Sequence, residues 1–277
     1  MSIILPDMFD MNYDKLVKYF LKKNGHAKYD YFHTPECKSV NKKNSRTSEG
    51  LELHHIDENK YPELNDPAFA LHSPFECQKA KRLVYVNVLE HLLLHIKIYE
   101  EKCWLNKATG KKIETTTPGI KRISNIANDY FSGNYSAGDW RENMAKVIIN
   151  DYDDFIAELY YYLQIVSKYF PNDNSTLHSA LTTVSQHYNS NIYKNTFYAL
   201  TSKFPEYTFA EPKKPVLKKL NLPSNDITFE IGEYVDHPSF GKGKVLSLAN
   251  PFIEVDFEEY GVKKLALGFA KLKKISE

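Results

Sequence analysis

The stretch LELHHIDENKYPELNDPAFALHSPFECQKAKRLVYVNVLEHLLLHIKIY, residues 51–99, contains five histidines, and four of them form two pairs. His54 and His55 are adjacent and follow a short apolar run, whereas His91 and His95 are four residues apart. Residues four apart lie on the same face of a helix, so the second pair can present two imidazoles to one ion. Because neutral imidazole is a common metal ligand, this stretch predicts a metal site.

The secondary structure expected here is strand, loop, strand, helix. Residues 51–56 and 82–88 have the composition of strands, and residues 57–80 contain three prolines and many polar residues, which indicates a loop. From residue 88 to residue 104 apolar side chains recur at helical spacing. The first histidine pair therefore falls at the end of a strand and the second pair falls on a helix.

Three of the histidines are candidate ligands. His54, His91 and His95 would leave a further coordination position open for water or a phosphate oxygen. His55 points to the other face of the strand unless the strand ends there, which suits a general base. Imidazole favours zinc, nickel, manganese or copper over magnesium. We expect a divalent ion, with Mg²⁺, Mn²⁺, Zn²⁺ and Ni²⁺ left open.

Two segments carry a resemblance to a known family. Leu53-His54-His55-Ile56 and Glu90-His91-Leu92-Leu93-Leu94-His95 look like the motifs of the HNH (ββα-metal, His-Me finger) endonucleases. The resemblance implies that His54, His91 and His95 hold the metal and that His55 is the general base. It also implies hydrolysis of DNA phosphodiester bonds to 5′-phosphate and 3′-hydroxyl ends.

The chain departs from the family pattern at one position. Arg82 stands where the family has an asparagine, nine residues before the first helical histidine. Whether Asn59, Asn65 or Asn87 replaces it is left open. Arg82 is expected to contact the scissile phosphate through its planar guanidinium.

Two further sets of residues are candidates for binding. Many members of the family carry a structural zinc near the site, which the pairs His33/Cys37 and His72/Cys77 could supply, although buried thiols are the alternative. A local basic cluster lies in a polar loop and either contacts phosphates or is simply solvated. Its residues are Lys38, Lys42, Lys43 and Arg46.

Composition narrows the class of protein. The 277 residues carry a formal net charge of +1, which argues against a globally basic nucleic-acid binder and leaves phosphate binding to local clusters. Three cysteines argue against a secreted, disulfide-stapled domain. The sequence shows no signal peptide and no apolar run long enough for a membrane span, so a cytoplasmic protein is expected.

The expected fold class is α+β, with a ββα-metal core embedded in a mainly helical domain. We expect the nuclease domain over residues 1–110, a helical domain over 111–204, a Pro/Lys-rich linker over 205–226 and a small all-β domain over 227–277. Within the helical domain, Asp139 is expected to cap one long helix that runs towards Phe170, followed by a further helix over residues 176–202.

The C-terminal segment has its own resemblance. The runs Gly232–Val245, Ile253–Phe257 and Gly261–Leu265 are similar to the Tudor-like (SH3-like) domain at the end of UvrD-type helicases. This resemblance implies a binding module that contacts RNA polymerase or DNA.

The sequence therefore predicts a metal-dependent HNH endonuclease that acts on DNA. Processing of phage or mobile-element DNA and defence against foreign DNA are both compatible with this activity. The alternative is a non-enzymatic, zinc-stabilised adaptor that binds nucleic acid or RNA polymerase through the C-terminal module.

Overall fold

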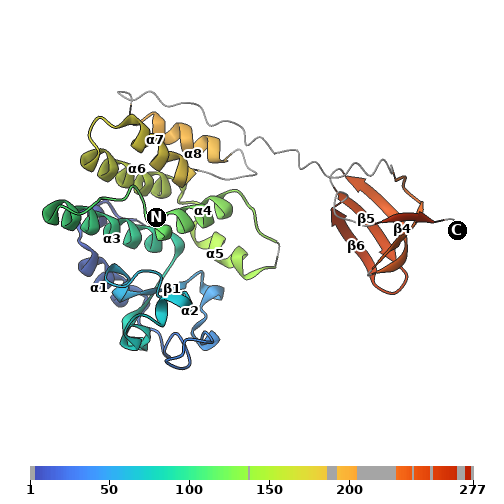
Figure 1. Ribbon diagram of the computed structural model, residues 1–277, viewed down its shortest axis with the longest axis horizontal. Helices are drawn as coiled ribbons and strands as arrows, with labels where there is room; N and C mark the ends of the chain where they lie inside the picture. Colours follow the sequence, from blue (N-terminus) through green and yellow to red (C-terminus); the bar gives the residue numbers. More distant parts are fainter. Residues whose placement is uncertain are drawn as a thin grey trace. The chain divides into compact units, whose positions relative to one another are not determined.

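The computed structural model describes residues 4–136, 138–185, 192–204, 229–238, 240–249, 252–266 and 272–275. The chain is a mixed α and β protein with two compact units, Met1–Pro212 and Lys213–Glu277, and each unit is described by itself (Figure 1). No helix in the described ranges is long and apolar enough to cross a lipid bilayer.

The first unit contains a two-stranded antiparallel sheet surrounded by helices. Strand β1 pairs with β2, with Glu52 opposite Val86 and His55 opposite Leu83. The elements are α1 (Tyr13–Asn24), β1 (Glu52–His55), α2 (Pro67–Ala70), β2 (Leu83–Val86), α3 (Val88–Thr109), α4 (Pro118–Phe131), α5 (Trp140–Ile148), α6 (Tyr152–Tyr169), α7 (Asn174–Ser185) and α8 (Ile192–Thr201).

Helix α3 is the central element of this unit. Apolar side chains cover several of its faces, and a helix that is apolar all round is stable only when buried. It packs against α1, α4 and α6, and in Figure 1 it lies between helices α6 to α8 and the part of the chain that holds β1 and α2. Since α3 also carries His91 and His95, the packing that buries the helix fixes both imidazoles.

Strands β1 and β2 and helix α3 follow one another as expected, and α3 continues beyond the expected end to Thr109. The segment expected as a loop between the strands also contains the short helix α2 and 3-10 turns. The single long helix expected after Asp139 is wrong. Asp139 caps α5, but the chain turns between α5 and α6, where the Asp151 amide donates to the Ile148 carbonyl at 2.8 Å. Asn150 and Asp151 favour such a turn because their side chains compete for backbone hydrogen bonds.

The other expected domain and helix boundaries agree only partly with the structure. The segments 1–110 and 111–204 lie in the same unit, because α3 shares one continuous apolar core with α4 and α6. The helix expected over 176–202 corresponds to α7 and α8, and the residues between these two helices lie outside the described part of the chain. The expected linker, residues 205–226, also lies outside the described residues.

The second unit is a five-stranded antiparallel sheet with the strand order β6-β5-β4-β3-β7. Its strands are β3 (Tyr234–His237), β4 (Gly241–Ala249), β5 (Phe252–Phe257), β6 (Gly261–Ala266) and β7 (Lys273–Ile275). A small core lies on this sheet, formed by Val235, Val245, Ile253, Val255, Phe257 and Leu272. These five strands agree with the small all-β domain expected over residues 227–277.

The start of α3 depends on a capping box, which gives a test of the fold. The Asn87 side chain accepts hydrogen bonds from the Leu89 and Glu90 amides, both at 3.0 Å, and Glu90 accepts from the Asn87 amide at 2.9 Å. We expect Asn87→Ala to lower the free energy of unfolding by about 1–2 kcal/mol, measured by urea denaturation. Asn12→Ala, which removes an exposed cap of α1, is the control. A loss no larger than that of the control would contradict the role of this cap.

Candidate metal centre

Four side chains from three segments meet in one buried group. His54 ends β1, Glu58 lies in the following 3-10 turn, and His91 and His95 lie on α3. One ligand atom from each of these residues lies within 4.8 Å of the others. The structure thus brings together the three histidines expected as ligands and adds a carboxylate to them.

The tautomer of His54 follows from its partners. The Tyr13 hydroxyl donates to the Ile56 carbonyl, which can only accept, at 2.9 Å. The tyrosine oxygen is therefore free to accept from His54 Nε2, which lies 2.8 Å away. The remaining nitrogen, His54 Nδ1, is fully buried and has no hydrogen-bond partner among the described residues. A bare nitrogen lone pair buried in this way is the atom that a metal ion would satisfy.

The histidines on α3 are arranged in a similar way. His91 Nδ1 donates to the Glu52 carboxylate at 2.7 Å, which leaves its Nε2 bare in the neutral ring. His95 Nε2 lies 3.2 Å from that nitrogen. A proton on His95 can bridge the two atoms in the metal-free chain, and a cation can take its place. Burial keeps the pKa of His54 and of His95 well below the usual range, so both rings are neutral and able to coordinate.

Glu58 was not predicted as a ligand. Its Oε2 lies 3.6 Å from His54 Nδ1 and 3.8 Å from His95 Nε2. The 3-10 turn Ile56–Asn59 reverses the chain directly after β1 and brings the carboxylate back towards the histidines. Burial raises the pKa of Glu58, and a bound cation would favour its ionised form. An acidic residue in a tight turn after the His54-His55 pair was the available signal in the sequence.

These donors fit a divalent transition metal. Three imidazole nitrogens and one carboxylate oxygen suit zinc, manganese, nickel or iron, whereas magnesium prefers oxygen ligands. With all four residues bound, a tetrahedral ion would have no open position. A five- or six-coordinate ion would keep one or two positions for water or a substrate oxygen.

Helix α4 packs directly against the centre through Gly119. A Cβ added to Gly119 would lie 2.2 Å from His95 Nδ1, far inside van der Waals contact. A side chain here would therefore displace the His95 ring or the helix. The helical part of the unit thus forms one wall of the centre.

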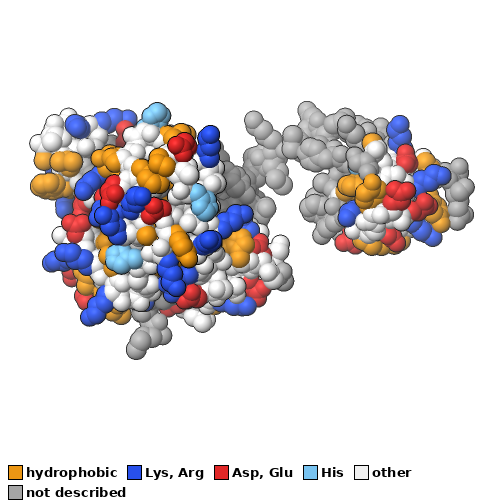
Figure 2. Space-filling model, turned by 90° about the horizontal axis from the view of Figure 1, so that it is seen from below, with side chains coloured by type: hydrophobic (Ala, Val, Ile, Leu, Met, Phe, Trp, Pro, Cys, Tyr) orange, Lys and Arg blue, Asp and Glu red, His pale blue; other side chains and the backbone are white. Residues whose placement is uncertain are grey.

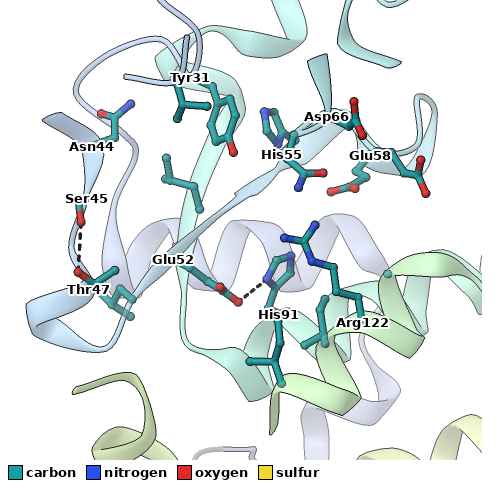
Figure 3. A pocket seen from close by; sticks show the side chains of 18 of the residues that line it. Tyr31, Asn44, Ser45, Thr47, Glu52, His55, Glu58, Asp66, His91 and Arg122 are labelled. Carbon is teal, nitrogen blue, oxygen red and sulfur yellow. Dashed lines mark hydrogen bonds and ion pairs between the residues drawn. The ribbon is translucent and has the colours of Figure 1, made fainter. Parts of the chain in front are cut away.

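A cavity of about 560 Å³ opens beside the group. Glu58, His91 and His95 line it together with His55 and with Arg122 of α4. Figure 3 shows the Arg122 guanidinium lying between His91 and the segment that carries His55 and Glu58. Arg122 is exposed and forms no ion pair with a carboxylate among the described residues. An exposed cation next to a candidate metal centre is suited to binding a phosphate.

His55 lines the same cavity but faces away from the ligand group. Its Nε2 lies 2.9 Å from Gln78 Oε1, and the Tyr31 ring packs edge-on against it with centroids 4.5 Å apart. Burial lowers the pKa of His55 to about 4, against a smaller upward effect of the Gln78 bond. The imidazole is neutral at pH 7 and can accept a proton.

Arg82 does not join this site. Its guanidinium forms two hydrogen bonds with the Asp57 carboxylate, and that pair lines a different, more open cavity with Cys77. Arg82 is not among the residues that line the cavity shared by His55 and the ligand group. Asn87 caps α3, and Asn65 lines the cavity of the metal centre.

The other predicted binding residues are dispersed. In the described part of the chain, the single group with metal-binding geometry contains none of His33, Cys37, His72 and Cys77. Of the basic cluster, Lys42 and Arg46 line the cavity of the metal centre. Arg46 pairs with Glu49 at 2.5 Å and donates to the Asn24 carbonyl, which gives it a structural role. Lys43 lies over the Tyr29 ring, and Lys38 is exposed.

A comparison of the chain with models of known protein families and with curated protein sequences found no match.

The hydrogen bond between Tyr13 and His54 gives a test of the centre. We expect Tyr13→Phe to weaken binding of Co²⁺ or Zn²⁺ by roughly 10–100-fold, because the ring would no longer be held in the tautomer that exposes Nδ1. Metal affinity is measured by titration calorimetry. Tyr162→Phe removes a buried hydroxyl that donates to the Thr115 carbonyl, and it serves as the control. Equal affinity in the wild type and Tyr13→Phe would contradict this arrangement.

The low pKa of His55 predicts that acid destabilises the metal-free chain. The unfolded chain takes up a proton near the ordinary pKa of about 6.5, whereas the folded chain resists it until about pH 4. This stability is fully present above pH 6.5 and is lost as the pH falls towards 4, with about 2 kcal/mol lost at pH 5. Urea denaturation of the wild type and His55→Asn in EDTA checks it. A pH dependence as steep in the variant as in the wild type would refute the assignment to His55.

Proposed function

We propose that this chain is a metal-dependent endonuclease of the HNH type that hydrolyses phosphodiester bonds of DNA. The observation that carries the proposal is the buried His54 Nδ1 lone pair, which faces Glu58, His91 and His95 at the wall of a cavity shared with His55. The proposal includes the fold: β1, β2 and α3 would form the ββα-metal unit. The second unit would be an SH3-like (Tudor-like) module that recruits RNA polymerase or DNA.

The residues of the cavity divide the reaction between them. A divalent cation held by His54, His91, His95 and Glu58 would polarise a phosphate oxygen and offset the charge that develops on the leaving oxygen. His55 takes the proton from the attacking water, since its ring is neutral. Arg122 binds a non-bridging phosphate oxygen through its free guanidinium. Tyr13 and Glu52 keep the ligand tautomers fixed throughout.

The distribution of charge on the surface favours binding of nucleic acid at a local site over binding across the whole surface. On the face shown in Figure 2, Lys and Arg side chains are interspersed with Asp and Glu, in agreement with the net charge of +1. Lys42 and Arg122 both line the cavity beside the candidate metal centre and can contact phosphates of a strand bound there. Glu63 and Asp66 line the same cavity and would repel phosphates that come close to them.

A second candidate function has one observation in its favour. Glu58 completes a set of four protein ligands, which is the number that a closed structural zinc site uses. In that case the chain would be a zinc-stabilised adaptor and the second unit would carry its binding function. Here the metal would stabilise the fold without supplying chemistry.

Cleavage of plasmid DNA separates the two functions. The wild type is incubated with Mn²⁺, Ni²⁺, Zn²⁺ or Mg²⁺ beside His55→Ala, Arg122→Ala and Lys121→Ala. We expect a loss of roughly 10²–10⁴-fold for His55→Ala, the range for a general base, and roughly 10²-fold for Arg122→Ala. Lys121→Ala, an exposed neighbour of Arg122, should retain wild-type activity.

The controls make each outcome decisive. Circular dichroism and metal affinity must match the wild type in the variants, because none of the three changed residues is a ligand. Absence of cleavage with all four metals would refute the nuclease and support the adaptor. Cleavage that survives in His55→Ala would refute the assignment of the base.

A further inference from the structure

We propose that Gln78 is the positioning residue that holds the His55 proton on Nε2 and so presents His55 Nδ1 as the proton acceptor. The assignment of the His55 tautomer depends on hydrogen-bond geometry alone. The expected effect of Gln78 on the rate of DNA cleavage rests on the proposed nuclease function.

The orientation of the Gln78 amide is fixed by a backbone group. Gln78 is fully buried, and its Nε2 donates to the Leu64 carbonyl at 3.1 Å. A carbonyl oxygen can only accept, so a flipped amide would place two acceptors against each other. The amide oxygen of Gln78 therefore faces His55.

The proton on His55 follows from that orientation. His55 Nε2 lies 2.9 Å from the Gln78 oxygen, an acceptor, so Nε2 must carry the hydrogen. In a neutral imidazole the other nitrogen is then bare. His55 Nδ1 is not among the fully buried polar atoms that lack a partner in the described chain. Since His55 lines the cavity, Nδ1 is the nitrogen open to a water molecule there.

Gln78 is itself held in place from several sides. It ends the 3-10 turn Phe75–Gln78, and its backbone carbonyl accepts a hydrogen bond from the Tyr31 amide at 2.7 Å. The Tyr31 ring packs against the His55 ring. One residue thus connects the loop at Leu64, the segment at Tyr31 and the imidazole. Such a brace restricts both the tautomer and the tilt of the ring, as a group that orients a catalytic base must do.

NMR of the full-length, metal-free chain tests the tautomer directly. Long-range ¹H–¹⁵N correlation spectra distinguish a protonated from a bare ring nitrogen, and the His55 signals are identified by their loss in His55→Ala. We expect a single Nε2–H tautomer in the wild type. Gln78→Met, which keeps the length of the side chain but removes the acceptor, should give a mixture of tautomers. Gln78→Glu keeps the acceptor and should restore Nε2–H. Gln164→Met, at an exposed site on α6, is the control.

The rate of cleavage tests the consequence. We expect Gln78→Met to lower kcat by roughly 10²-fold at unchanged metal affinity, since Gln78 touches none of the ligands. An Nδ1–H tautomer in the wild type, or an unchanged tautomer and rate in Gln78→Met, would overturn the proposal. If Gln78→Met does not fold, the wild-type and Gln78→Glu spectra still decide the tautomer. A chain that shows the expected tautomers but cleaves no DNA would refute the nuclease function and leave the role of Gln78 in the tautomer intact.

Discussion

The hydrogen bond from Tyr13 to the Ile56 carbonyl determines the chemistry of the buried centre. It commits the only hydroxyl proton of Tyr13, so the tyrosine oxygen must accept from His54 Nε2, and His54 Nδ1 must be bare. Burying that lone pair without a partner is unfavourable unless something binds it. Helix α1, which carries Tyr13, and the turn after β1 are therefore part of the candidate metal site.

Hydrogen-bond acceptors fix other imidazoles of the centre in the same way. Three of the four imidazoles are fixed by an acceptor on one ring nitrogen: Tyr13 for His54, Glu52 for His91 and Gln78 for His55. These acceptors come from α1, β1 and the turn before β2. The burial of α3 holds the second pair of histidines against them. The apolar core and the polar site therefore depend on each other. Packing of α3 fixes the positions of the imidazole rings, and hydrogen bonds fix which ring nitrogen carries the proton.

Part of this could be predicted from the sequence. The apolar spacing around His91 and His95 predicts helix α3, and the β-branched and aromatic run before it predicts strand β2. The ligand role of Glu58 could not be predicted, because it depends on the reversal of the chain in a short 3-10 turn. The pairing of Arg82 with Asp57 could not be predicted for a related reason: the two residues are 25 positions apart, and only the fold brings them together.

Gln78 and Arg122 show a further limit. Neither lies in a recognisable motif. Gln78 is buried and contacts His55, whereas Arg122 lines the cavity, and the sequence does not specify the packing that places either residue there. The HNH motif that the chain resembles has an asparagine at the position of Arg82, and the sequence does not show which residue here would brace the loop. In the structure Gln78 joins the Leu64 carbonyl to His55.

The contact between Gly119 and His95 has a consequence for recognising relatives of this chain. Any Cβ at this position would overlap the imidazole, so a protein that keeps both the centre and the approach of α4 must keep a glycine there. A glycine early in the helix that follows the histidine helix, together with the two histidine pairs, defines a signature that short motif searches around the histidines alone would miss. Divergent sequences can be screened for it, and those that keep the histidines but carry a larger residue at this position must place their helices differently.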